Sequence, residues 1–183
     1  MKVLIHACCA DCLLKMVKSL ADKKVEIAVY FYNPNIHPRA EYLSRLKAIK
    51  QIAEKNNIKL MITDWSPREW FEGIRGCFSK PKRCERCWNL RLRKTFEYAK
   101  NHSFEGVSTT LLTSHYQDEG KIEEIGKKLE KEFEIKFLIP KKVVRNLETG
   151  GFYKQNYCGC CYSLVETWGE KFKNKNKGSK LLR

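Results

Sequence analysis

The chain has 183 residues, of which 43% are hydrophobic and 11% aromatic, so it is long enough to bury a core and too apolar to be disordered. Its 36 Lys and Arg residues oppose 21 Asp and Glu, which gives a net charge of +15 and indicates an anionic partner. No apolar run is long enough for a transmembrane helix, and the N-terminal sequence turns polar and cysteine-rich too early for a signal peptide. We therefore expect a soluble, cytoplasmic protein with no membrane partner.

The first third of the chain alternates predicted strands and helices. Apolar, β-branched runs predict three strands, at residues 2–7, 25–32 and 58–63. Helical spacing of apolar side chains predicts one helix that begins near Asp11, the expected N-cap, and a second around residues 42–53. A turn-forming cluster with two prolines, residues 33–38, lies between them. This order is typical of a parallel sheet with right-handed crossovers.

The same alternation continues to about residue 140. Ser66-Pro67 predicts the start of a short helix, and further helices are expected within residues 83–100 and 119–132. Strands are expected at residues 106–112 and 135–139. From Lys141 onward the pattern is irregular, with a Gly150-Gly151 turn and a last helix near residues 162–171.

These elements predict one α/β domain, a Rossmann-like parallel sheet with helices on both faces, of the kind found in HUP and PP-loop proteins. We expect the α/β core with its metal-binding loops at residues 1–140 and a C-terminal segment at residues 141–170. The last 13 residues carry six Lys or Arg and no acid, so residues 171–183 are expected to fray as a basic tail.

Nine cysteines fall into three groups: Cys8, Cys9 and Cys12; Cys77, Cys84 and Cys87; Cys158, Cys160 and Cys161. A cytosol keeps thiols reduced and an odd number cannot pair completely, so disulfides are not expected. Metal ligation and thiol redox chemistry remain as the two possible roles of these cysteines.

Residues 6–12 follow the first predicted strand, at the sheet edge where ligands of such folds bind. This loop has no glycine to cradle phosphates; its thiols indicate a soft metal centre rather than ATP. The Cys84-x-x-Cys87 pair lies at a predicted helix start, which stabilises thiolates. The spacing alone fits zinc, iron–sulfur or dithiol sites, and structural zinc on Cys8, Cys9, Cys84 and Cys87 stays an alternative.

The third group, Cys158-Gly-Cys160, follows the flexible double glycine and has two open interpretations, as metal ligands or as a redox dithiol. Cys12, Cys77 and Cys161 are interpreted as structural.

Five segments together resemble the QueH family of epoxyqueuosine reductases, the cobalamin-independent type. They occur in this order: residues 6–12, 30–38, 84–87, 108–112 and 153–160. The resemblance runs from residue 3 to about residue 165. Lys154 departs from the family's usual arginine, Asp11 from its frequent proline, and Cys161 has no consistent counterpart.

The resemblance implies reductive deoxygenation of epoxyqueuosine in tRNA to queuosine, the last step of queuosine biosynthesis. It implies a [4Fe-4S] cluster on Cys8, Cys9, Cys84 and Cys87. Cys158 and Cys160 would form the family's second thiol pair, either a redox dithiol or ligands of a second iron ion, and Asp11 is a third catalytic candidate. Removing an epoxide oxygen needs electrons and a proton donor, which agrees with such a site. We expect a ferredoxin or flavodoxin as electron donor.

A tRNA substrate accounts for the positive charge. Basic residues crowd around the second cysteine group: Arg75, Lys80, Lys82, Arg83, Arg86, Arg91 and Arg93. Of these, Arg86 is the candidate for substrate binding. Tyr32, Tyr153 and Tyr157 are candidates for stacking on a flipped base, and Asn33 and Gln155 for reading its polar groups.

Among the histidines, His6 is interpreted as a core residue, and His37 and His115 as loop candidates for proton transfer. Two other functions are alternatives to the reductase. An ATP-dependent tRNA thiolation enzyme would need a Ser-Gly-Gly phosphate loop, which is absent after the first strand. A non-enzymatic zinc protein that binds nucleic acid would need only the thiols and the basic charge.

Overall fold

A computed structural model describes residues 1–141, 143–144, 151–153 and 155–179. The strands are β1 (Lys2–His6), β2 (Glu26–Phe31), β3 (Lys59–Ile62), β4 (Gly106–Thr109) and β5 (Lys136–Phe137). The α-helices are α1 (Ala10–Leu20), α2 (Arg39–Lys55), α3 (Pro67–Gly73), α4 (Lys82–Asn101), α5 (Glu119–Phe133) and α6 (Cys161–Ser179). Two 3₁₀ turns, η1 (Ala21–Lys23) and η2 (Thr110–Thr113), complete the described elements.

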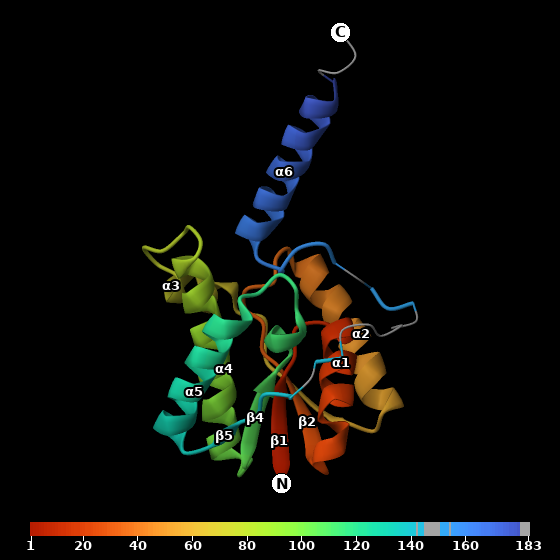
Figure 1. The fold of residues 1–183 in the computed structure, drawn as a ribbon, viewed down its shortest axis with the longest axis vertical. Helices are drawn as coiled ribbons and strands as arrows, with labels where there is room; N and C mark the ends of the chain where they lie inside the picture. Colours follow the sequence, from red (N-terminus) through yellow and green to blue (C-terminus); the bar gives the residue numbers. More distant parts are fainter. Residues whose placement is uncertain (142, 145–150, 154, 180–183) are drawn as a thin grey trace.

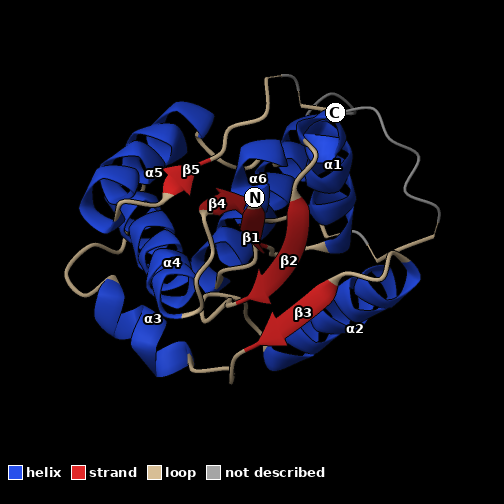
Figure 2. Cartoon of the chain, turned by 90° about the horizontal axis from the view of Figure 1, so that it is seen from below, coloured by secondary structure: helices blue, strands red, loops and turns tan. Residues whose placement is uncertain are grey.

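The five strands form one parallel sheet in the order β3-β2-β1-β4-β5. The chain winds outward from β1 to β3 and then returns to β4 beside β1. Helices α1 and α2 cover one face, whereas α4 and α5 cover the other (Figures 1 and 2). The predicted fold class is confirmed. The direction of winding reverses between β1 and β4, and their carboxyl ends are therefore where a ligand site is expected.

The core explains why the elements form where they do. β1 is covered on both faces, and Val3, Leu4 and Ile5 are fully buried, as a continuous apolar run predicts. On α4, Leu92, Phe96 and other apolar side chains at helical spacing form a buried stripe against the sheet.

Several boundaries differ from the sequence expectation. Asp11 does not cap α1: Cys9 is the N-cap, with extended backbone angles, and Asp11 lies in the first turn. The fourth strand ends at Thr109, because the following residues turn into η2, where the Thr109 hydroxyl accepts a hydrogen bond from the Leu111 amide. β5 spans only two residues because it lies at the sheet edge and pairs only with β4.

The C-terminal helix is longer than predicted. α6 continues to Ser179, through most of the basic tail that was expected to fray. No proline interrupts this segment, so no helix breaker of that kind ends the helix at residue 171. Of the predicted glycine turn, Gly151 has a positive φ of 77° and Gly150 lies outside the described residues, as does Lys154. Among the helices of the described chain, none has the length and apolarity needed to cross a membrane.

A glycine on α5 tests the packing of the sheet edge. A Cβ atom on Gly126 would lie 2.2 Å from Phe137 of β5, which is closer than real contacts allow. Gly126→Ala should therefore lower the melting temperature despite the better helix propensity of alanine, with a loss of about 1–3 kcal/mol from overpacking. Gly169→Ala on α6 is the matched control, because nothing lies within 4 Å of its Cβ. Equal melting temperatures for the two variants would contradict this packing.

Candidate active site

Two of the three cysteine groups meet in one cavity. It is narrow, about 20 Å³, and is lined by Asn35, Trp70, Arg83, Cys84, Cys87, Trp88, Arg91, Gln117, Cys158 and Cys160. The C-x-x-C and C-x-C motifs are therefore neighbours in space, although more than 70 residues separate them in the sequence. The loops from the strand ends and the start of α6 converge at this end of the molecule (Figure 1).

The C-x-x-C thiols lie in the first turns of α4. The helix begins directly after Pro81, which serves as its N-cap. Cys84 is half-buried and Cys87 buried, and burial raises the pKa of both thiols. The helix N-terminus acts in the opposite direction, because its free N–H groups favour negative charge. A cation or cluster that binds here would meet two thiols already held on a rigid element.

The C-x-C thiols depend on the glycine between them. Gly159 has a φ of +120°, and a Cβ there would lie 3.2 Å from both Arg45 and Ile36, so a larger residue is disfavoured. The sulfur atoms of Cys158 and Cys160 are 3.7 Å apart and hydrogen-bonded. This hydrogen bond lowers the pKa of Cys158 to about 5 and raises that of Cys160. The two sulfur atoms of the pair therefore interact directly.

The first cysteine group lies at the carboxyl end of β1. The Cys8 amide donates a hydrogen bond to the Thr110 hydroxyl of η2, which fixes the loop to β4. Cys8, Cys9 and Cys12 are all buried, and their thiols interact with one another. Hydrogen bonds with Cys12 and Cys9 lower the pKa of Cys8 well below its usual value, whereas the contact with Cys8 raises that of Cys12. Cys12 is therefore part of this thiol group.

A buried arginine lies between the first group and the cavity. Arg91 of α4 is only 2% exposed, and among the described residues no carboxylate forms an ion pair with it; one guanidinium nitrogen donates to Asn33 Oδ1 at 2.8 Å. Its positive charge acts on Cys8, whose pKa it lowers, and likewise on Cys87. A buried cation without a carboxylate is costly unless another anion balances it. Thiolates at Cys8 and Cys87, on which the Arg91 charge acts, would supply that negative charge.

The cavity also holds buried hydrogen-bond donors with no complete partner. They are the indole N–H of Trp70 and the Nε–H groups of Arg83 and Arg91. Those of Trp70 and Arg91 lie near enough to Cys87 to lower its pKa, although neither makes a well-formed hydrogen bond. Buried donors are almost always satisfied. Three open donors beside four thiols therefore fit a sulfur-rich anionic group in this cavity.

The donor set suits a multinuclear group better than a single ion. Within the part of the chain that is described, no three His, Cys, Asp or Glu side chains are grouped closely enough to hold one metal ion. A cluster of several irons accepts thiolates that stand further apart, and cysteine is its usual ligand. The six thiols of the three motifs come from a loop, a helix start and a second loop, which is the spread that such a group requires.

Comparison with known proteins identifies the family. A family model described as Epoxyqueuosine reductase QueH matches residues 3–166. Curated proteins named Epoxyqueuosine reductase QueH include one from Thermotoga maritima, 35% identical over 90% of this chain and 91% of its own. The protein of that name from Acinetobacter baylyi is 32% identical over 91% of this chain and 82% of its own. The one from Haemophilus influenzae is 30% identical over 93% of this chain and 75% of its own. The chain belongs to the QueH family.

In this QueH chain, two predicted substrate-binding residues are buried. Asn33 is 2% exposed, and its amide donates to the Ala7 carbonyl and accepts from Arg91. Tyr32 is 4% exposed and its ring is stacked with Tyr30, so it offers no face to a base. Both residues follow β2. The sequence alone could not distinguish a side chain exposed at the site from one buried below it.

The other predicted residues are accessible to different degrees. Tyr153 is 45% exposed, and its hydroxyl donates to the Glu41 carboxylate; Gln155 is half-buried. Arg86 is exposed, and its guanidinium donates to the Arg75 carbonyl. Asp11 forms an ion pair with Lys15 at 2.7 Å. The roles of these residues, and the ligand set Cys8, Cys9, Cys84 and Cys87, remain predictions.

The basic cluster around the C-x-x-C divides into two classes. Arg83 and Arg91 are each 2% exposed, so the expectation that they face a phosphate backbone is wrong. Arg83 pairs with Glu166 of α6 at 2.8 Å, and Arg93 pairs with Glu132. The guanidinium groups of these three arginines serve the interior and the helix contacts. The exposed cations of the cluster are Arg75, Lys80, Lys82 and Arg86.

The histidine interpretation is confirmed for His6. It is fully buried between Thr109 Oγ1 and the Tyr32 carbonyl, and desolvation lowers its pKa to about 3, so it stays neutral. His37 lies half-buried among Trp65, Trp70 and Phe71, where desolvation lowers its pKa, and neither of its ring nitrogens has a hydrogen-bond partner. His115 is exposed and packs on Tyr116.

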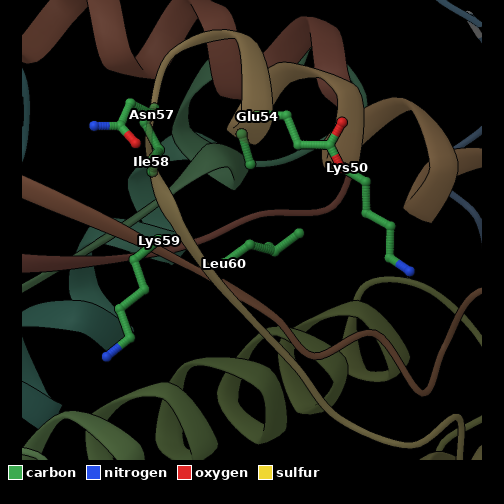
Figure 3. Close-up of a pocket in the computed structure, with 7 residues that line it drawn as sticks. Lys50, Glu54, Asn57, Ile58, Lys59 and Leu60 are labelled. Carbon is green, nitrogen blue, oxygen red and sulfur yellow. The ribbon is translucent and has the colours of Figure 1, made fainter.

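A wider surface hollow lies away from the cysteines. It measures about 490 Å³ and lies at the amino end of β3, between Lys50, Glu54 and Lys59 (Figure 3). Ligands of this sheet type bind at the carboxyl ends of the strands. With no thiol in its lining, the hollow is not a second cysteine site.

One buried cation, missed by the sequence analysis, connects the C-x-C motif to the fold. Arg45 of α2 is 1% exposed and pairs with Glu41 at 2.6 Å. Its other nitrogens donate to the carbonyls of Cys158 and Tyr157 at 3.3 and 3.4 Å, and its guanidinium lies over the Tyr157 ring. The four-residue spacing of Glu41 and Arg45 was the available signal, but an exposed helix pair has the same spacing.

Arg45→Met should release the C-x-C segment and leave Glu41 as an uncompensated buried charge, at a cost of about 3–5 kcal/mol of unfolding free energy. Hydrogen exchange at residues 157–160 should become faster, and alkylation of Cys158 should accelerate. The matched control is Arg68→Met, because Arg68 and Glu72 form the same i,i+4 pair on an exposed surface. Unchanged exchange in Arg45→Met, or an equal effect in both variants, would contradict the proposed contact.

Proposed function

We propose that this chain reduces epoxyqueuosine in tRNA to queuosine. The epoxide loses its oxygen: two electrons and two protons are consumed, both C–O bonds break, and an alkene and one water form. The observation that carries this proposal is the cavity in which four thiols meet three buried, incompletely paired N–H donors. Membership of the QueH family supplies the substrate, since its curated relatives carry the name epoxyqueuosine reductase.

We infer a [4Fe-4S] cluster with Cys8, Cys9, Cys84 and Cys87 as the proposed ligands. Cys84 and Cys87 line the cavity, and Cys8 and Cys9 belong to the group at the carboxyl end of β1. Such a cluster supplies electrons singly at low potential. Cys158 and Cys160 would then serve as a redox dithiol or as ligands of a second iron. The shared cavity favours their direct involvement, because it brings both next to Cys84 and Cys87. The electron donor would be a small protein such as a ferredoxin or flavodoxin.

The surrounding residues stabilise negative charge at this point. Arg91 holds a buried positive charge between two thiol groups, and Trp70 directs an N–H toward Cys87. Arg45 adds positive charge that lowers the pKa of Cys158. Cys158 and Cys160 line the cavity, so a thiol of this pair would be placed to deliver a proton to the departing oxygen.

Anaerobic purification followed by iron and sulfide analysis tests the proposal directly. A brown protein with equal iron and acid-labile sulfide, which converts epoxyqueuosine in tRNA when given dithionite, supports it. A colourless protein with stoichiometric zinc and no turnover would instead favour the structural-zinc alternative. The ATP-dependent alternative is tested in the same assay by adding or omitting ATP.

Cysteine substitutions test the proposed ligands. Cys84→Ala and Cys87→Ala should each lose most of the visible absorbance near 400 nm and most of the bound iron, because each removes a thiolate ligand. Cys77→Ala is the control, since Cys77 lies in the same part of the chain but does not line the cavity. Full iron retention in both C-x-x-C variants would refute this assignment.

The C-x-C pair should be separable from the cluster. Cys158→Ser and Cys160→Ser should keep the brown colour and the iron of the cluster, yet lose at least 100-fold in turnover with a strong chemical reductant. The physical reason is that serine cannot share the proton or the redox change that the pair of sulfur atoms provides. Loss of the cluster itself in either variant would make that cysteine a ligand, and full activity in both would make the pair structural. Absorbance, iron content and turnover are measured on the same samples.

A further inference from the structure

Helix α6 projects away from the rest of the molecule at the end where the cavity lies (Figure 1). It begins at Cys161, directly after the C-x-C motif, and its 19 residues extend for about 28 Å. The base of the helix is fixed. Glu166 pairs with Arg83 of α4 and with Lys80, and the Arg83 guanidinium lies over the Tyr162 ring. A rigid rod therefore stands at the rim of the proposed active site, and we call residues 161–179 the α6 arm.

One face of the α6 arm is apolar and uncovered. Val165, Trp168 and Phe172 are 70%, 59% and 65% exposed. Their spacing of three and four residues places them on the same side of the helix. Large exposed aromatic side chains in line are uncommon on a protein without a partner at that surface. The anchoring contacts of Tyr162 and Glu166 lie at other positions, so they leave this face free.

The charge of the arm identifies the kind of partner. Residues 171–183 carry six Lys or Arg and no acidic residue, and Lys171 is exposed beside Phe172. A second copy of the same arm would bring two strongly basic segments together, which is unfavourable. A polyanion with exposed ring systems matches both features, because phosphates attract lysines and nucleobases stack on aromatic side chains. An anionic membrane would match the charge, but it would cover the rim of the cavity with lipid.

We propose that the α6 arm binds RNA, with Trp168 and Phe172 stacked on unpaired nucleobases and the lysines of the arm on phosphates. This rests on the proposed function for the identity of the RNA as tRNA. The cavity is too small to hold a nucleobase, so a substrate base would lie at its mouth, and its stem-loop would continue outward from the strand ends. The arm points in that direction and offers a surface far longer than the cavity (Figure 1).

Fluorescence anisotropy with labelled tRNA, measured across a salt series on the full chain, tests the proposal. Trp168→Ala with Phe172→Ala should weaken binding about tenfold, the loss expected for one or two stacked bases. Lys171→Gln with Lys173→Gln and Lys175→Gln should reduce the slope of log K against log salt by about two to three. The matched control carries the same charge loss on the exposed face of α2: Lys47→Gln, Lys50→Gln and Lys55→Gln, for which we expect the parent affinity and slope.

The alternatives have their own outcomes. If both arm variants bind tRNA like the α2 control, the arm does not bind RNA. If sedimentation shows a dimer that Trp168→Ala with Phe172→Ala dissociates, while tRNA affinity is unchanged, the apolar face joins two copies and the proposal falls. Saturable binding to phosphatidylglycerol vesicles with unchanged tRNA affinity would assign the face to lipid and also overturn it.

Failure of the arm and failure of the proposed reaction are distinguishable. The anisotropy assay needs no reductant and no turnover. If the parent protein binds tRNA through the arm but converts no epoxyqueuosine, the RNA-binding arm stands and the reductase function fails. If the parent converts epoxyqueuosine while the arm variants bind tRNA as tightly as it does, the function stands and the arm proposal fails. Circular dichroism of each variant checks that the helix is retained.

Discussion

The candidate site depends on the buried guanidinium of Arg45. It joins α2, the helix of the sheet's second crossover, to a segment more than 110 residues later, through the carbonyls of Tyr157 and Cys158. Desolvating this ion pair is costly, and the cost is offset only because Glu41, two carbonyls and an aromatic ring surround the charge. Gly159 must be a glycine for the same reason, since a Cβ atom there would press on the Arg45 side chain. The C-x-C thiols lie beside the C-x-x-C thiols because this contact holds them there.

The general form of the fold was accessible from the sequence, because it depends on local patterns. Apolar, β-branched runs marked the strands, and apolar side chains at helical spacing marked the helices. A boundary that a tertiary contact decides is not visible in these patterns. Residues 110–113 have the composition of a strand, but Thr110 accepts a hydrogen bond from the Cys8 amide, and the chain turns there. The last helix was expected to end near residue 171, whereas α6 continues to Ser179.

The site was accessible only in part. Cysteine spacing identified the motifs, but not that C-x-x-C and C-x-C share a cavity or that the Cys12 thiol, interpreted as structural, interacts with Cys8 and Cys9. Nor could the sequence distinguish an arginine that meets solvent from one that lies under the sheet edge. Arg83, Arg86 and Arg91 are within nine residues, yet only Arg86 is exposed. Helical position decides this: Arg83, Cys87 and Arg91 recur every four residues and face the interior, whereas Arg86 lies on another face of α4.

Positive charge acts on the buried thiols and continues to the surface beside them. The guanidinium groups of Arg91 and Arg45 act on Cys8 and Cys158, where water is largely excluded. Arginine charge, with the N-terminus of α4, opposes the burial that raises the pKa of Cys84 and Cys87. The exposed cations Lys82 and Arg86 extend the positive potential outward. Proteins of this sheet type that bind nucleotides at this edge use glycines to let backbone amides contact phosphate; here, the extended backbone at Cys9 needs no glycine, and the loop carries thiols.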